Sequence, residues 1–125
     1  MRYILPLLTC GAALMLLAAT CKQSTGNGLY KGRLEVDGLC KNYTIAFTGT
    51  PPANATVAAS WTDSNTGTTY RNVFRLGNPC DFPETIKKGD EFQFRIVEAK
   101  TQNCAICRAF YPTPSEALNI EVTTR

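Results

Sequence analysis

Apolar and polar residues alternate along most of the chain beyond residue 29. Five segments carry apolar side chains at every second position: Leu34 and Val36; Tyr43, Ile45 and Phe47; Val57, Ala59 and Trp61; Phe92, Phe94 and Ile96; Leu118, Ile120 and Val122. This period is typical of strands that bury one face, and Trp61, Phe92 and Phe94 are expected in the core. Apart from one turn near Pro83 to Lys87, no segment has helical periodicity. The pattern predicts an all-β barrel or sandwich of six or seven short antiparallel strands.

Turn residues punctuate these strands. Asp37-Gly38 lies between Val36 and Leu39, and both residues tolerate the positive φ that a tight hairpin turn requires. We therefore expect a hairpin that pairs Val36 with Leu39. A longer turn is expected at 63–67. The short spacing of the strands and the Lys88-Gly89-Asp90 lead into a strand resemble an OB-type barrel, and OB-like is the more specific expectation.

The first twenty residues have the composition of an export signal. Arg2 precedes an apolar run from Ile4 to Ala19, which is too short to span a bilayer comfortably, and the chain turns polar directly after Cys21. The segment 16–21, Leu-Leu-Ala-Ala-Thr-Cys, resembles the lipobox of bacterial lipoproteins, with Ala18 and Thr20 as departures from the usual residues. An ordinary secretory peptide cut near Ala19 is the alternative.

The lipoprotein resemblance implies cleavage before Cys21 and acylation of that cysteine. Three parts of the chain follow from it: a signal peptide at 1–20, a lipid-anchored flexible tether at 21–28, and one all-β domain at 29–125. The expected location is the bacterial cell envelope, on its periplasmic or cell-surface face, and the first expected partner is membrane lipid held through Cys21.

Six cysteines become four in the mature domain, because Cys10 leaves with the signal peptide and Cys21 is acylated. Cys40, Cys80, Cys104 and Cys107 are an even set in an exported protein, which predicts two disulfides. An up-and-down strand order favours the pairs Cys40–Cys104 and Cys80–Cys107. A Greek-key crossing would change these pairs, and a local Cys104–Cys107 bond would pair Cys40 with Cys80.

The spacing Cys104-Ala105-Ile106-Cys107 also suggests a thiol-disulfide oxidoreductase, because such a motif at a helix start can lower a thiol pKa. No βαβ pattern and no helix follow the motif, so structural disulfides are the preferred interpretation. Zinc is disfavoured for the four thiols, because only one pair has the required spacing.

Composition argues against catalysis and against nucleic-acid binding. The 125-residue chain contains no histidine, which removes the commonest general base, and its 13 basic side chains only slightly exceed the 10 acidic ones. No carboxylate pair can be placed across a cleft, and no serine has a histidine partner. We expect no catalytic residues, no metal and no cofactor.

The remaining candidate residues lie beside prolines and cysteines. Phe82, Phe110 and Tyr111 could form an exposed recognition patch, with Lys87 and Lys88 at its rim. The sequence thus favours a lipid-anchored, non-enzymatic module that binds a protein or a glycan, or that has a structural role in the envelope. A lysozyme-type hydrolase inhibitor is an alternative, which rests on size, anchoring and β layout alone.

Overall fold

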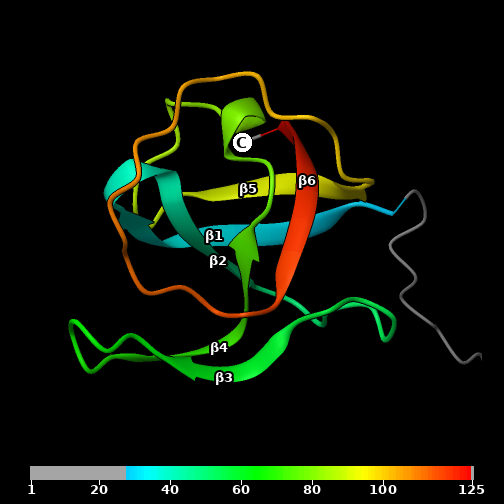
Figure 1. The fold of residues 1–125 in the computed structure, drawn as a ribbon. Coiled ribbons are helices and arrows are strands. Elements are labelled where there is room, and N and C mark those ends of the chain that lie inside the picture. The colour runs from blue at the N-terminus through cyan, green and yellow to red at the C-terminus, as the bar shows by residue number, and fades with distance from the viewer. Residues whose placement is uncertain (1–27, 125) are drawn as a thin grey trace, which may run out of the picture.

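A computed structural model describes residues 28–124 (Figure 1). The predicted signal peptide at 1–20, Cys21 and the rest of the tether up to residue 27 lie outside this range. The elements are β1 (Tyr30–Gly38), η1 (Leu39–Lys41), β2 (Asn42–Phe47), β3 (Ala58–Thr62), β4 (Thr69–Leu76), η2 (Pro79–Asp81), β5 (Glu91–Val97) and β6 (Ala117–Thr124), where η marks a 3-10 turn. Within 28–124, no helix is long and apolar enough to cross a membrane.

Five of the strands close into a barrel. β1 pairs with β2 and β5, β4 pairs with β2 and β6, and β5 pairs with β6. This is the connectivity of an OB-type Greek-key barrel. The all-β prediction is confirmed, with a barrel in place of a sandwich. One pairing, β4 with β6, is parallel, which corrects the expectation of antiparallel strands throughout. It joins Arg75 to Ala117 and Leu76 to Leu118.

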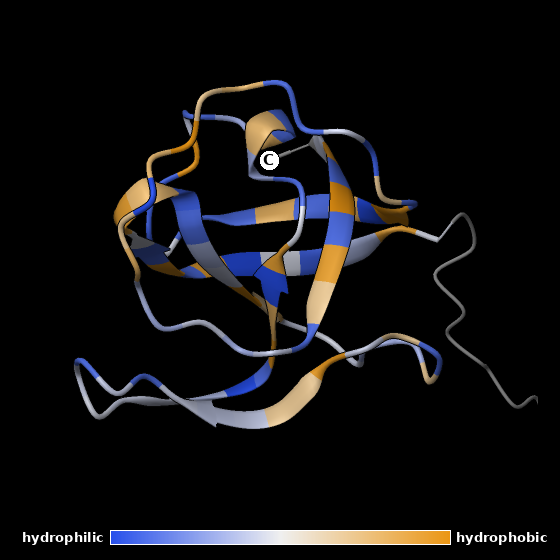
Figure 2. Ribbon diagram, viewed as in Figure 1, coloured by the Kyte–Doolittle hydropathy of each residue, from blue (hydrophilic) through white to orange (hydrophobic). Residues whose placement is uncertain are grey.

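The barrel interior is filled by the apolar face of every closing strand. Phe94 and Phe74 are fully buried, and their ring centroids lie 6.0 Å apart. Phe47 contacts both rings, at 5.3 and 5.4 Å. Figure 2 shows the sequence pattern that produces this burial: along β6, hydrophobic and hydrophilic residues alternate. Successive side chains of a strand point to opposite faces, so period two buries every second residue. The strand prediction is thereby confirmed for β1, β2, β5 and β6.

The first hairpin turns later than the sequence predicts. β1 continues through Asp37 and Gly38, which pair with Tyr43 and Asn42, and the reversal occurs at η1. Positive φ angles fall on Cys40 (57°) and Lys41 (59°) instead of on Asp37-Gly38. The predicted pairing of Val36 with Leu39 is therefore wrong, because contacts of η1 with a distant loop outweigh the local turn preference.

β3 and the first half of β4 form a hairpin outside the barrel (Figure 1). Asn72 has a φ of 52°, a left-handed conformation that asparagine tolerates better than most residues. It lies directly before Val73, which pairs both with Ala58 of β3 and with Ala46 of β2, so it marks the point where β4 enters the barrel. Trp61 lies on this hairpin, half-buried and stacked near Tyr70 at 6.1 Å. The prediction that Trp61 belongs to the main core is wrong, since it covers a separate small cluster of Ala46, Ala58 and Val73.

Candidate functional site

A long loop, residues 98–116, connects β5 to β6 and wraps around the barrel without helix or strand structure of its own (Figure 1). Loops of this length in a compact domain are usually functional or disordered. Here the loop is fixed by two disulfides, by a hydrogen bond from Tyr111 to Asp63, and by the fully buried Pro114. A loop attached at so many points presents its exposed residues in a defined geometry.

The disulfides join Cys80 to Cys104 and Cys40 to Cys107, with Cα–Cα distances of 5.6 and 5.1 Å. The predicted pairs Cys40–Cys104 and Cys80–Cys107 are therefore wrong, although all four predicted cysteines are bonded. After β5 the loop passes η2 first and η1 second, so its first cysteine meets Cys80. The Greek-key path of the chain causes this order, and an up-and-down barrel would not produce it. Two disulfides indicate an oxidising compartment.

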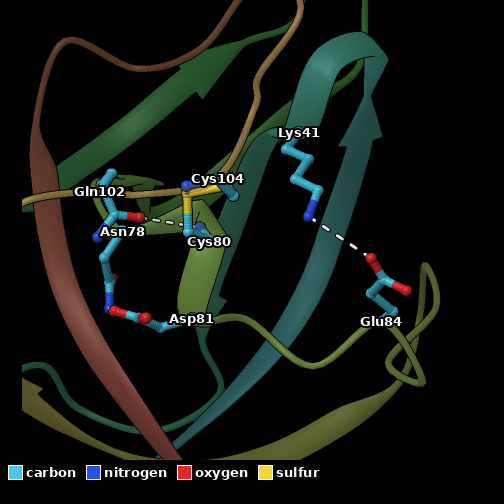
Figure 3. Close-up of a disulfide and its surroundings, with 7 residues drawn as sticks. All are labelled: Lys41, Asn78, Cys80, Asp81, Glu84, Gln102 and Cys104. Carbon is cyan, nitrogen blue, oxygen red and sulfur yellow. Dashed lines mark hydrogen bonds and ion pairs between the residues drawn. A yellow bond between two sulfur atoms is a disulfide. The ribbon is translucent and has the colours of Figure 1, made fainter.

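The Cys80–Cys104 bond is embedded in a polar network (Figure 3). The backbone N–H of Cys80 donates to Oε1 of Gln102 at 2.9 Å, and the N–H of Cys104 lies 3.3 Å from Sγ of Cys80. Beside it, the buried side chain of Asn78 donates to the carbonyl of Ile120 and accepts from its N–H, at 2.7 and 2.9 Å. These contacts connect η2 and the loop to the barrel, so this end of the loop is a structural attachment.

The Cys40–Cys107 bond joins η1, which connects β1 to β2, to the 98–116 loop, which connects β5 to β6. Nδ2 of Asn42 donates both to the carbonyl of Leu39 at 2.7 Å and to that of Ala109 at 3.1 Å. The N–H of Ala109 also lies 3.3 Å from Sγ of Cys40. One amide nitrogen and one disulfide thus hold both backbones together. In OB-type barrels the corresponding two loops border the ligand-binding face.

The large hydrophobic side chains that are exposed within 28–124 all belong to residues next to this clamp in the sequence. Leu39 is 66% exposed and precedes Cys40, Ile106 is 39% exposed and precedes Cys107, and Phe110 is 86% exposed and follows Ala109. We call these three residues the apolar loop surface. Exposed apolar side chains scattered singly need no explanation, but a group of them on two joined loops is typical of an interaction site.

The predicted binding residues do not form one patch. Phe82 is buried, with its ring 5.4 Å from both Tyr43 and Phe92, so it belongs to the core. Lys87 and Lys88 are exposed on the turn before β5, where Nζ of Lys87 donates to the carbonyl of Glu84 at 2.9 Å. Of the predicted set, Phe110 alone is part of the apolar loop surface.

Tyr111 is half-buried and joins the loop to the outer hairpin. Its ring lies against Gly38, and its hydroxyl donates to Oδ2 of Asp63 at 3.0 Å. The Asp63 side chain is 1% exposed, and its Oδ1 accepts the N–H of Asn65 at 2.8 Å. The pKa of Tyr111 is raised, chiefly because the hydrogen bond to Asp63 favours the protonated phenol. These contacts hold Tyr111 in place and so fix the backbone at the neighbouring Phe110.

A second tyrosine near the clamp is perturbed by burial. The pKa of Tyr43 is raised first by desolvation and then by the negative charges of Asp37 and Glu84. Glu84 also lies 3.6 Å from Nζ of Lys41, in the ion pair drawn in Figure 3. Exposed pairs of this kind stabilise by about 0–1 kcal/mol, so the pair contributes little to holding η1 in place.

Cys104 and Cys107 do not bond to each other, since each has a partner in a different element. A cycle between a dithiol and a local disulfide would have to exchange both existing bonds. In the part of the chain that the structure describes, no group of three or more Cys, His, Asp or Glu side chains is placed to hold a metal ion. Comparison of the chain with protein-family models, curated proteins and solved structures found no match.

Sequence reasoning missed Leu39 and Ile106. Leu39 is interpreted from the pattern as a strand residue, because the tight turn is predicted at Asp37-Gly38, before the reversal that occurs at η1. Ile106 lies between Cys104 and Cys107, and the spacing of these cysteines predicts disulfide or redox chemistry but no apolar surface. The sequence does offer one signal for both residues: each directly precedes a cysteine, in a segment where apolar and polar residues do not alternate. Once the disulfide pairing is known, both residues are seen to precede the two ends of the same bond.

Proposed function

We propose that this protein is an exported, non-enzymatic binding module, anchored to the bacterial cell envelope through an acylated Cys21, which binds a partner protein through Leu39, Ile106 and Phe110. One observation carries the proposal: the most exposed large apolar side chains of the described domain flank the disulfide that joins the two loops. The lipobox-like segment before Cys21 supports the anchor.

The disulfide clamp suits binding because it fixes the surface before a partner arrives. Ordering a flexible side chain or loop at an interface costs about 0.5–1.5 kcal/mol for each group. The covalent bond between Cys40 and Cys107 and the Asn42 hydrogen bonds restrict both backbones in the free protein. Full burial of a Leu, Ile or Phe side chain stabilises by about 1.5–3 kcal/mol. Three such residues on a fixed backbone supply the driving force of a specific interface.

The position of the anchor favours a partner away from the membrane. The tether joins the domain just before Tyr30, at the start of β1, and the apolar loop surface lies beyond Gly38, where β1 ends (Figure 1). A strand of nine residues spans about 25 Å. An anchored domain can therefore present Leu39, Ile106 and Phe110 on the side opposite its attachment, towards other proteins of the envelope.

The chemistry of the three residues favours a protein over a glycan. Two are aliphatic and one is an aromatic ring without a polar group, and such side chains fill apolar pockets at protein interfaces. A hydrolase cleft is one pocket of this kind, so inhibition of a hydrolase is one form that the binding function can take. Identifying the partner protein will distinguish inhibition of a hydrolase from a structural role in the envelope.

Site-specific photo-crosslinking in cells tests the binding surface. A photoreactive phenylalanine analogue at position 110 is expected to give a discrete cross-linked product, identified by mass spectrometry. The same analogue at Ser64, which is exposed on the outer hairpin, is the matched control. The product at position 110 should disappear when Leu39→Ser is added. Equal products at both positions, or a product at 110 that is insensitive to Leu39→Ser, would contradict the proposal.

The anchor is tested separately. Intact mass spectrometry of the membrane-extracted protein should show a chain that begins at Cys21 and carries the mass of acyl groups. Cys21→Ser should move the protein from the membrane fraction to the soluble fraction while the disulfides at the other four cysteines persist. An unmodified Cys21 in wild-type protein would remove the anchor but leave the binding surface to its own test.

A further inference from the structure

The outer strand β3 has one free edge. Within residues 28–124 it pairs with β4 and with no other strand, whereas each of the five barrel strands has at least two neighbours. Figure 1 shows β3 as the outermost strand at the bottom of the view. Ala59, Ser60 and Thr62 are exposed along it. A free edge presents unpaired backbone N–H and C=O groups, which can pair with another strand.

The ladder with β4 identifies which backbone groups are free. The N–H of Asp63 donates to the carbonyl of Thr68 at 2.9 Å, so positions 63 and 68 form a hydrogen-bonded pair. Thr62 and Thr69 form the next pair, where the two side-chain hydroxyls lie 2.8 Å apart, as expected of a non-hydrogen-bonded pair. By alternation, Ala58, Ser60 and Thr62 direct their backbone N–H and C=O groups away from β4.

This edge is short, with five residues, but it lacks the other features that usually protect an edge strand. Natural edge strands carry lysine, other inward charges, proline or a bulge that prevents pairing between copies. The sequence of β3 is Ala-Ala-Ser-Trp-Thr, without an ionisable side chain and without proline. The carboxylate of Asp63, which follows β3, is buried and bonded to Tyr111. Nothing at this edge repels an identical edge.

We propose that β3 is a self-association edge, at which a second copy of this chain adds its own β3 in antiparallel orientation about a twofold axis at Ser60. Ser60 then exchanges both backbone hydrogen bonds with Ser60 of the second copy, and Ala58 does so with Thr62 of that copy. A twofold interface uses the same patch on both subunits, so a strand that matches itself is the required feature.

The side chains of β3 also match under this symmetry. The axis places the exposed Ala59 opposite Trp61 of the second copy, in a non-hydrogen-bonded pair where side chains approach closely. Trp61 is half-buried in one chain, and a small alanine beside it leaves room for the ring. The two Trp61–Ala59 contacts of the dimer bury apolar surface that one chain leaves exposed.

Charge repulsion across the axis is weak. The nearest exposed charge in the strand register is Arg71, which pairs with Ser60 from β4. Two copies of Arg71 are separated by three strand spacings, about 14 Å. This exceeds the screening length of about 8 Å at physiological ionic strength. Because β3 itself is uncharged and the two Arg71 side chains are far apart, electrostatic repulsion does not prevent pairing of two β3 strands.

The test uses full-length chains that carry two different C-terminal tags and are co-expressed, extracted in mild detergent and captured by one tag. Wild-type chains are expected to co-purify, and sedimentation should give the mass of a dimer. Ser60→Lys places two like charges directly opposite each other, which is destabilising across strands, so co-purification should be lost. Ser64→Lys adds the same charge off the edge, and co-purification should persist.

A charge exchange tests the twofold position itself and shows that the variants fold. Chains with Ser60→Lys and chains with Ser60→Glu should co-purify with each other, because opposite charges then meet across the axis. Monomeric wild-type protein at micromolar concentration would overturn the proposal. Equal association of the Ser60→Lys and Ser64→Lys variants, or failure of the Lys and Glu chains to restore association, would overturn it as well.

Discussion

The hydroxyl of Tyr111 donates a 3.0 Å hydrogen bond to the buried carboxylate of Asp63. This bond connects the 98–116 loop to the hairpin of β3 and β4, two segments that are far apart in sequence. The residue before Tyr111 is Phe110, the most exposed of the three residues of the apolar loop surface. The hydrogen bond between Tyr111 and Asp63 therefore fixes the backbone next to Phe110, although neither of these two residues belongs to the apolar loop surface.

The Tyr111–Asp63 bond should depend on pH in the alkaline range. The pKa of Tyr111 is raised above the ordinary 10.0, so the bond contributes fully below pH 10 and is lost as the pH rises through the higher folded pKa. Ultraviolet absorbance of tyrosinate, compared between wild type and Tyr111→Phe, isolates this residue from Tyr43. The difference curve should have its midpoint above 10. A midpoint at or below 10 would contradict the assigned hydrogen bond.

The two disulfides should stabilise the domain to different extents. In the chain-entropy model the stabilisation by a disulfide increases with the logarithm of the length of the loop that it closes. Cys40–Cys107 spans 67 positions and Cys80–Cys104 spans 24. Replacing both cysteines of a bond by alanine is expected to cost about 4 kcal/mol for the first and about 3 kcal/mol for the second. Urea unfolding measures both, and the reverse order would show that the clamp at η1 is not formed as described.

Gly38 should not tolerate a side chain. A Cβ atom at this position would lie 2.6 Å from the carbonyl oxygen of Asn42 and 2.8 Å from the ring of Tyr111. Both neighbours are held in place, so Gly38→Ala should destabilise by about 2 kcal/mol, as overpacking typically does. Gly49→Ala is the matched control, because no atom lies within 4 Å of its added Cβ. Thermal unfolding of both variants decides the matter, and equal melting temperatures would refute the Tyr111 contact.

Asn72 should be replaceable by glycine but not by a β-branched residue. Its φ of 52° lies in the left-handed region, where a β-branched side chain is strained. Asn72→Val is expected to destabilise by about 1–2 kcal/mol, and Asn72→Gly to leave stability nearly unchanged. Denaturant midpoints of the two variants provide the comparison. A tolerated valine would mean that β4 runs straight from the outer hairpin into the barrel.

Much of the barrel is predictable from local pattern. Period two in the sequence identifies β1, β2, β5 and β6, because successive side chains of a strand point to opposite faces. In β2 both faces are buried from Thr44 to Phe47, since Ala46 packs in the small cluster under the outer hairpin. The pattern does not distinguish the inside of the barrel from a small cluster outside it, and so Trp61 is assigned to the wrong core. The parallel pairing of β4 with β6 also leaves no local signal, since either orientation buries the same alternate residues.

The candidate site is less predictable than the fold because it depends on long-range contacts. The Asp37-Gly38 turn signal is strong, yet the chain turns at Cys40, where a disulfide and the Asn42 hydrogen bonds to the 98–116 loop hold it. The pairing of the cysteines follows from the path of that loop, which composition does not encode. Phe110 is predicted as a binding residue, whereas Leu39 and Ile106 become visible only once Cys40 and Cys107 are paired.

The affinity of the purified full-length protein for the partner captured at position 110 tests the central claim most directly. If the apolar loop surface is the contact, the double variant Leu39→Ser, Phe110→Ser should bind at least about 30-fold more weakly, as expected when about 2 kcal/mol of contact free energy is lost. Ser64→Lys should bind like wild type. Unchanged affinity of the double variant would show that the partner binds elsewhere and would contradict the proposed function.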